Sequence, residues 1–248
     1  MTSVIVRQAR MEDVVELVEV EKQTWSDLGT EVYGAGQFQS WLEVNPVCFL
    51  VAENKGKLVG YVYGQMMNFS VDDIPKFVSS DEVTDHGYTR KTHNPSGDSL
   101  YGMSVVSIQP GAGKVLIQAF YQLVIDLRKK CSFSFPRISG FDAYCRQLEE
   151  TGVLPFPIPQ DLEADVALWY AVECAKLAGE KVWDVCSVPP LFSLPKPIAP
   201  DPVLNWHLRH WHLPASRLGI VKVLHNFMPD RQSRNYTVFI CSDLPGLK

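Results

Sequence analysis

The chain has 248 residues, of which 46% are hydrophobic and 21% are charged, and its formal net charge is −5 at pH 7. This composition predicts a soluble globular protein with a full core in one or two domains. The acidic balance, with one short basic run at 128–130, argues against a nucleic-acid partner. No apolar run is long enough for a membrane span, and early charged residues argue against a signal peptide.

The six cysteines are widely and irregularly spaced and include no Cys-x-x-Cys pair. Neither a disulfide framework nor a zinc site is predicted, and a reducing cytoplasm is the expected location. His207 and His210 stand three residues apart, but no third ligand follows at a known spacing. We therefore expect no bound metal.

The first third of the chain predicts a strand, two helices and a hairpin. Residues 4–10 alternate as in a strand, and the acidic start at 11–13 opens a helix that runs to about Trp25. A second helix is expected over 36–44, before a proline. Two alternating apolar runs, 47–53 and 57–68, flank a short polar turn and predict a β-hairpin.

The stretch 69–97 is polar and lacks a strong period. Its length suggests a functional loop, and in this position it could cover an acceptor site. A solvated surface loop is the equal alternative, because polar loops are common on protein surfaces.

The most informative stretch is 99–130. Residues 100–108 are apolar and predict a buried strand, which Pro110 ends because it lacks an N–H. Gly111 and Gly113 permit a tight turn and close approach of a ligand to the backbone. From Lys114 the apolar residues recur at helical spacing. The free N–H groups at such a helix start favour an anion, so the turn predicts a phosphate or pyrophosphate site.

Two well-known phosphate loops fit this turn poorly. A Walker loop would need glycine at Ile108 and Ser or Thr at Val115. A Rossmann fingerprint would need a third glycine at Leu116. An ordinary strand-to-helix turn, with glycines for tight packing, remains an alternative.

The second half of the chain adds further strands and helices. A strand is expected over 131–138, although Pro136 weakens its far half. Asp201 and Pro202 provide the start of a helix over 203–211. The other expected elements are helices at 140–150 and 161–177, a proline-rich connector at 189–202, and strands at 218–226 and 236–242.

The order of strand, glycine turn and amphipathic helix resembles the coenzyme A loop of the GNAT acyltransferases, Gln/Arg-x-x-Gly-x-Gly/Ala. The same family is resembled by two further parts of the sequence. One is the opening motif Arg-x-Ala-x-x-x-Asp at 7–13, and the other is the pair of hairpin segments at 50–53 and 58–62. Three more sequence segments resemble one branch of this family, which is found fused to nitrilase-like domains and in polyketide-synthase loading modules. These segments are 137–140, 201–208 and 226–230. The resemblance covers nearly the whole chain, with an insertion near 174–200.

This resemblance implies an α/β (α+β) GNAT fold in a single domain over 1–248. Its mixed central sheet would have about seven strands flanked by helices, with two parallel strands splayed apart at the cofactor site. It also implies an enzyme that transfers an acyl group from acetyl-CoA or another acyl-CoA through a tetrahedral intermediate. The acceptor would be a small-molecule or peptide amine. The implied coenzyme A contacts are Val106 and Ile108, whose N–H groups would polarise the thioester, and Gln109, Gly111, Ala112, Gly113 and Lys114 at the pyrophosphate.

The catalytic residues are less clearly marked. His207 is the candidate general acid, because it stands where GNAT enzymes often have a tyrosine and imidazole titrates near neutrality. Trp25 stands where the loading-module branch has a functional tryptophan. The strand before the turn lacks the glutamate that many GNAT enzymes use as a base, and offers Tyr101, Ser104 and Ser107 instead. A water chain or a carboxylate from the 70–97 stretch could replace it.

Two other functions stay open. One is transfer to an acyl-carrier-protein thiol, with or without decarboxylation. Met228 stands where the decarboxylating relatives have an arginine, and a methionine cannot pair with a malonyl carboxylate. Arg231 or Arg137 could instead pair with the malonyl carboxylate. The other is a degenerate GNAT fold that binds ligands without catalysis.

Overall fold

The computed structural model describes residues 4–26, 32–69, 79–178, 194–210 and 217–243. The chain divides into two compact units, Met1–Ser134 with Asp243–Lys248, and Phe135–Ser242. The expectation of a single domain stays a prediction. Much of the proposed insertion, 179–193, lies outside the described residues, as does the 70–78 part of the stretch suggested to cover an acceptor site.

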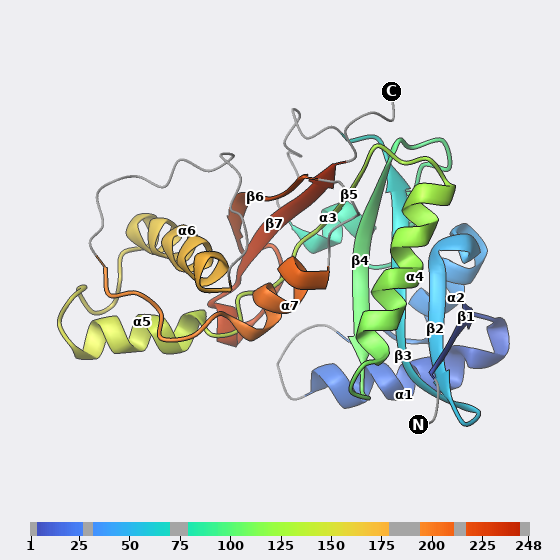
Figure 1. Ribbon diagram of the computed structural model, residues 1–248, viewed down its shortest axis with the longest axis horizontal. Coiled ribbons are helices and arrows are strands. Elements are labelled where there is room, and N and C mark those ends of the chain that lie inside the picture. The colour runs from blue at the N-terminus through green and yellow to red at the C-terminus, as the bar shows by residue number, and fades with distance from the viewer. Residues whose placement is uncertain (1–3, 27–31, 70–78, 179–193, 211–216, 244–248) are drawn as a thin grey trace. The chain divides into compact units, whose positions relative to one another are not determined.

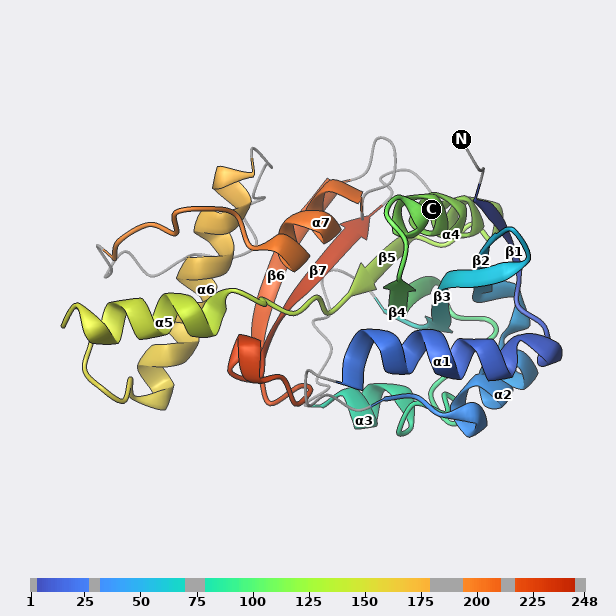
Figure 2. The same ribbon diagram turned by 90° about the horizontal axis from the view of Figure 1, so that it is seen from below.

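The first unit holds a five-stranded sheet between helices. The strands follow the spatial order β1-β2-β3-β4-β5; the first four are antiparallel, and β5 runs parallel to β4. Helix α4 covers one face of the sheet, and α1 and α2 cover the other (Figures 1 and 2). The strands are β1 (Ile5–Gln8), β2 (Phe49–Asn54), β3 (Lys57–Met67), β4 (Ser99–Ser107) and β5 (Cys131–Ser134), and the helices α1 (Val14–Trp25), α2 (Ala35–Val44), α3 (Ser80–Thr84) and α4 (Ala112–Asp126).

The second unit consists of three helices and two neighbouring strands. Asp201 caps α7 as expected, because its Oδ1 accepts from the N–H groups of Val203 at 3.0 Å and Leu204 at 2.9 Å. The elements are α5 (Phe141–Glu150), α6 (Gln160–Leu177), α7 (Pro202–His210), β6 (Arg217–His225) and β7 (Tyr236–Asp243). None of the described helices combines the length and apolarity that a membrane crossing requires.

Two expectations need correction. The strand predicted over 131–138 ends at Ser134, because the chain soon reaches Pro136, which has no N–H for a ladder. The stretch 69–97 contains a short helix, α3, whose first turn is capped by the Ser79 hydroxyl. The Ser79 hydroxyl accepts a hydrogen bond from the Glu82 N–H at 3.2 Å.

An aromatic core holds α2 against the sheet. Trp41 of α2 stacks on Tyr63 of β3, with 4.3 Å between ring centroids and 4° between planes. Phe38, Phe49 and Tyr61 pack around this pair and are fully buried. Burial of such large rings is a main source of stability and fixes the position of α2 relative to β2 and β3.

Gly60 lets β3 and β4 approach closely beside the candidate site. A Cβ built there would lie 2.4 Å from the Val106 carbonyl oxygen. Gly60→Ala is therefore expected to lower the free energy of unfolding by about 2 kcal/mol, as overpacking does, measured by urea denaturation. Gly34→Ala is the control, because its Cβ would meet its nearest atom at 3.5 Å. Equal stability of the two variants would contradict this prediction.

Candidate active site

Strand β4 separates from β5 after a short paired segment. Only Ser99, Leu100 and Tyr101 of β4 pair with β5. On that side, residues 102–107 of β4 have no strand partner among the described residues. The second half of β4 therefore presents an open edge with backbone groups that a ligand can bind.

A β-bulge in β4 lies close to the point where β4 separates from β5. Tyr63 of β3 pairs with Ser104, whereas the next residue, Gly64, pairs with Gly102. Met103 is thus left without a partner on β3. Such an extra residue bends and twists its strand, and the bend begins two residues after the last pair with β5.

The open edge leads directly into the glycine turn. Gly111 has φ +86° and is the N-cap residue of α4, a conformation that glycine adopts without strain. A Cβ at Gly111 would meet no atom within 4 Å. The turn therefore faces open space, and a ligand can approach its backbone.

The N–H groups of this turn are partly used within the turn. Ala112 N donates to Gln109 O at 3.2 Å, and Gly113 N donates to the Ser107 hydroxyl at 3.1 Å. Within the described parts of the chain, the N–H groups of Gly111 and Lys114 donate no hydrogen bond. Two open amides at the positive end of α4 make an anion site.

The donors on the open edge differ by one residue from the expected ones. The Ile108 N–H donates to Val59 O of β3 at 2.9 Å, so it points away from the open edge. N–H directions alternate along a strand, and the groups that face the open edge therefore belong to Val105 and Ser107. This corrects the expected use of the Val106 and Ile108 N–H groups. The Gln109 side chain accepts from Asn54 Nδ2 at 2.8 Å.

A buried carboxylate lies on the face of the sheet covered by α1. Glu21 of α1 is 1% exposed. Its Oε2 accepts from the Tyr61 hydroxyl at 2.5 Å, and its Oε1 accepts from the Tyr33 N–H at 3.1 Å. The Tyr61 hydroxyl also lies 3.1 Å from Ser104 Oγ. Glu21 is thus connected to the unpaired half of β4.

Burial raises the pKa of Glu21 to about 7, against the opposing effect of hydrogen bonds from Tyr61, the Tyr33 N–H and Trp25. The structure therefore brings the predicted Trp25 to a carboxylate that sequence reasoning missed. A signal was present, because Glu21 stands seven residues after Val14 and four after Leu17, on the apolar stripe of α1. An acid at such a position deserves a functional explanation.

No family model and no curated protein sequence matches the chain. Among solved structures it is similar to GphF GNAT-like decarboxylase in complex with isobutyryl-CoA, at 16% identity and a TM-score of 0.60, covering 98% of this chain and 100% of that one. It is also similar to the loading GNATL domain of CurA from Lyngbya majuscula, at 17% identity and a TM-score of 0.60, covering 97% and 98%.

The chain has the GNAT fold. The fold class expected from the sequence is confirmed, including the mixed sheet and the parallel strands that part beside the glycine turn.

In this GNAT-fold chain, His207 lies on α7 of the second unit and is partly buried. Its Nδ1 lies 2.9 Å from Val203 O, so Nδ1 carries the hydrogen. Burial of the ring lowers the pKa of His207 to about 4. The imidazole is therefore neutral at pH 7, in contrast with the expectation that it titrates near neutrality.

Arg137 of the second unit forms a buried ion pair with Asp230. Its Nε lies 2.9 Å from Asp230 Oδ2, and its Nη2 donates to Asp230 Oδ1 at 3.0 Å and to Gln232 Oε1 at 2.5 Å. The ion-pair contact of Nε and the two hydrogen bonds of Nη2 hold the guanidinium in a fixed place. Arg137 is thus a structural cation rather than a substitute for the arginine missing at Met228.

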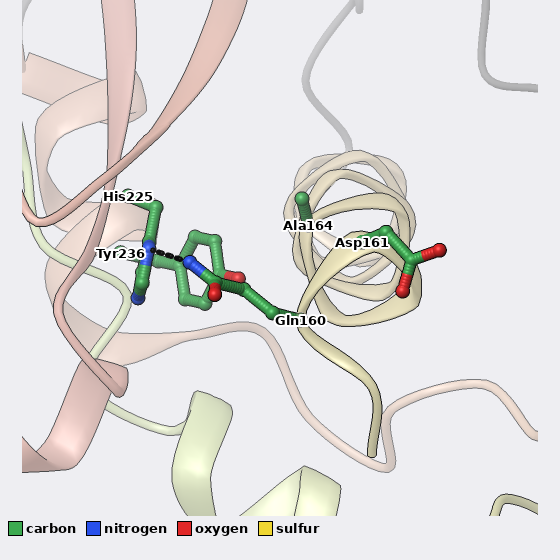
Figure 3. Close-up of a pocket in the computed structure, with 5 residues that line it drawn as sticks. All are labelled: Gln160, Asp161, Ala164, His225 and Tyr236. Carbon is green, nitrogen blue, oxygen red and sulfur yellow. Dashed lines mark hydrogen bonds between the residues drawn. The ribbon is translucent and has the colours of Figure 1, made fainter.

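Two surface hollows are lined by residues outside the glycine turn. One, of about 520 Å³ in the second unit, contains no predicted site residue; Gln160 Nε2 and His225 Nδ1 lie 3.0 Å apart across it, while Asp161 points away (Figure 3). The other, of about 290 Å³ in the first unit, includes Tyr33, whose N–H binds Glu21, and Asp81, whose Oδ2 lies 3.2 Å from His86 Nδ1. Across the described residues, no group of three His, Cys, Asp or Glu could hold a metal.

Proposed function

We propose that this chain is an acyltransferase that binds an acyl-CoA along the open half of β4 and transfers the acyl group to an amine. The observation that carries the proposal is the continuous path from the unpaired residues 102–107 to the exposed amides of Gly111 and Lys114. Outward-facing backbone N–H groups can stabilise the oxyanion formed from a thioester, and a helix N-terminus favours a diphosphate. Here the two adjoin in sequence.

Each residue group has a separate task in this proposal. When bound, acyl-CoA supplies the activated thioester. The N–H groups of Val105 and Ser107 face the edge where its carbonyl would lie and would stabilise the tetrahedral oxyanion. Gly111 and Lys114 would hold the diphosphate, with Ala112 and Gly113 forming the first turn behind them. Trp25 would help to order the buried carboxylate Glu21.

The structural relatives support an acyl-CoA as the donor, since one was solved with isobutyryl-CoA. The acceptor is inferred from the hollow beside Tyr33. Its Asp81 carboxylate gives the surface a negative group, which favours a positively charged amine. A neutral His207 would act by hydrogen bonding or packing rather than as an imidazolium acid.

Transfer to an acyl-carrier-protein thiol is the second candidate, because the relatives include a loading domain and a decarboxylase. Decarboxylation is the weaker part of this alternative. Met228 supplies no cation and Arg137 is already paired with Asp230, so only the exposed Arg231 is left of the two arginines considered. Plain acyl transfer is therefore the reaction we favour.

Isothermal titration calorimetry with acetyl-CoA and isobutyryl-CoA tests the proposal. We expect a Kd in the roughly micromolar to millimolar range usual for enzyme substrates. Mass spectrometry of reactions with small amines, and with a phosphopantetheine-loaded carrier protein, then identifies the acceptor. Absence of binding at millimolar acyl-CoA would overturn the proposed function.

A further inference from the structure

Glu21 occupies a place in the core where a carboxylate opposes folding. It is 1% exposed, and the groups that face it are the Trp25 indole of its own helix, the Tyr33 N–H and the Tyr61 phenol of β3, with the Tyr33 phenol close to Tyr61. No charged side chain among the described residues stabilises its ionised form. A buried, unpaired acid is costly, so a role beyond packing is indicated.

We propose that Glu21, Tyr61 and Ser104 form a relay that takes a proton from the acceptor amine, an inference that rests on the acyl transfer proposed above. The Tyr61 hydroxyl lies 2.5 Å from Glu21 Oε2 and 3.1 Å from Ser104 Oγ. Ser104 belongs to the half of β4 without a β5 partner and is half-buried. Ser104 is therefore the end of the relay that a substrate can reach.

The proton balance is simple. The ammonium form of the acceptor gives one proton to Ser104 Oγ, the Ser104 proton moves to Tyr61 O, and the Tyr61 proton moves to the Glu21 carboxylate. The neutral amine then forms an N–C bond with the thioester carbonyl, and the C–S bond breaks. The second amine proton ends on the coenzyme A thiolate, and Glu21 returns its proton to solvent.

The titration of Glu21 distinguishes this relay from a structural role. Its folded-state pKa is raised by burial to about 7, above the ordinary value of 4.5. The folded protein therefore binds more protons than the unfolded chain between these values, and stability falls as pH rises through that window. Glu21→Gln removes this loss, so the variant should be at least as stable as the wild type at pH 8. A structural carboxylate would give the opposite result.

The kinetic test compares two acceptors of nearly the same shape, ethylamine and methoxyamine, with isobutyryl-CoA as the donor. Ethylamine is protonated at pH 7 and needs a base, whereas methoxyamine is already neutral. We expect Glu21→Gln and Tyr61→Phe to slow transfer to ethylamine by roughly 100-fold or more, with methoxyamine changed only a few-fold. The wild-type ethylamine rate should rise with pH through a midpoint near 7, and Glu21→Gln should lose that midpoint.

Tyr63→Phe is the matched control. Tyr63 lies on the same strand as Tyr61 and is equally buried. Its hydroxyl forms a hydrogen bond with Thr89 Oγ1 at 2.9 Å, whereas the Tyr61 hydroxyl binds Glu21. Tyr63→Phe should leave both rates within a few-fold. Absence of isobutyryl-CoA binding by the wild type would count against the proposed function itself. A wild type that binds isobutyryl-CoA but acylates neither amine would count against both the relay and transfer to an amine. Equal losses with both acceptors, or unchanged rates, would overturn the relay alone.

Discussion

Gly111→Asp is expected to weaken acyl-CoA binding by roughly 100-fold or more, whereas Gly111→Asn should retain most of it. Asn and Asp both tolerate the left-handed backbone better than other residues with a side chain, and they have nearly the same size. Only Asp adds a negative charge beside the open amides. Like charges about 4 Å apart near a protein surface repel by about 4 kcal/mol, and each 1.4 kcal/mol is about tenfold in affinity.

Gly56→Asp is the control for backbone strain. Gly56 has φ +77° in the β2–β3 turn, and its Cβ would also meet nothing within 4 Å. Calorimetry with isobutyryl-CoA should show near wild-type affinity for this variant. The loss in Gly111→Asp should shrink at high salt, because the repulsion is screened. Equal losses for Gly111→Asn and Gly111→Asp would instead indicate a steric effect, and no loss in either would remove this turn from the binding site.

Arg137→Met is expected to destabilise the second unit by about 3–5 kcal/mol, the usual cost of leaving a buried charge without its partner. Arg137 is 7% exposed and Asp230 2%. Asp230 also accepts from the Gln232 N–H at 3.0 Å and from the Ser233 hydroxyl. Loss of the guanidinium therefore leaves the carboxylate with neutral donors alone.

The measurement is denaturant unfolding followed by far-ultraviolet circular dichroism. Arg137→Met combined with Asp230→Asn removes both charges and should recover a large part of the loss, since the pair matters more than either member. Arg231→Met is the matched surface control, because Arg231 is exposed. If Arg137→Met were as stable as Arg231→Met, the ion pair would contribute little, and Arg137 would again be a candidate for binding a carboxylate substrate.

The strands, helices and glycine turn were accessible from the sequence because each depends on local patterns. The hairpin over β2 and β3, the cap at Asp201 and the turn at Gly111 all follow from residues a few positions apart. The order of strands and helices along the chain, together with the family-like sequence motifs, was enough to predict the GNAT fold.

The site's chemistry depended on contacts between distant residues. Glu21 and Tyr61 meet across forty positions of sequence, and no periodicity reports such a meeting. The pairing of Ile108 with Val59 of β3 decides which N–H groups of β4 face outward, so these groups lie one residue from the expected ones. The lowered pKa of His207 likewise comes from burial on folding, which a sequence position alone does not fix.

The Ser107 hydroxyl cross-links the backbone of the glycine turn through two hydrogen bonds. It accepts from the Gly113 N–H and donates to Gln109 O at 2.8 Å, so the turn keeps its shape without a ligand. A small inorganic anion that displaced this hydroxyl would exchange one hydrogen bond for another and gain little. The diphosphate proposed to bind here would instead use the open amides of Gly111 and Lys114, so it would leave the hydrogen bond between Gly113 and Ser107 in place.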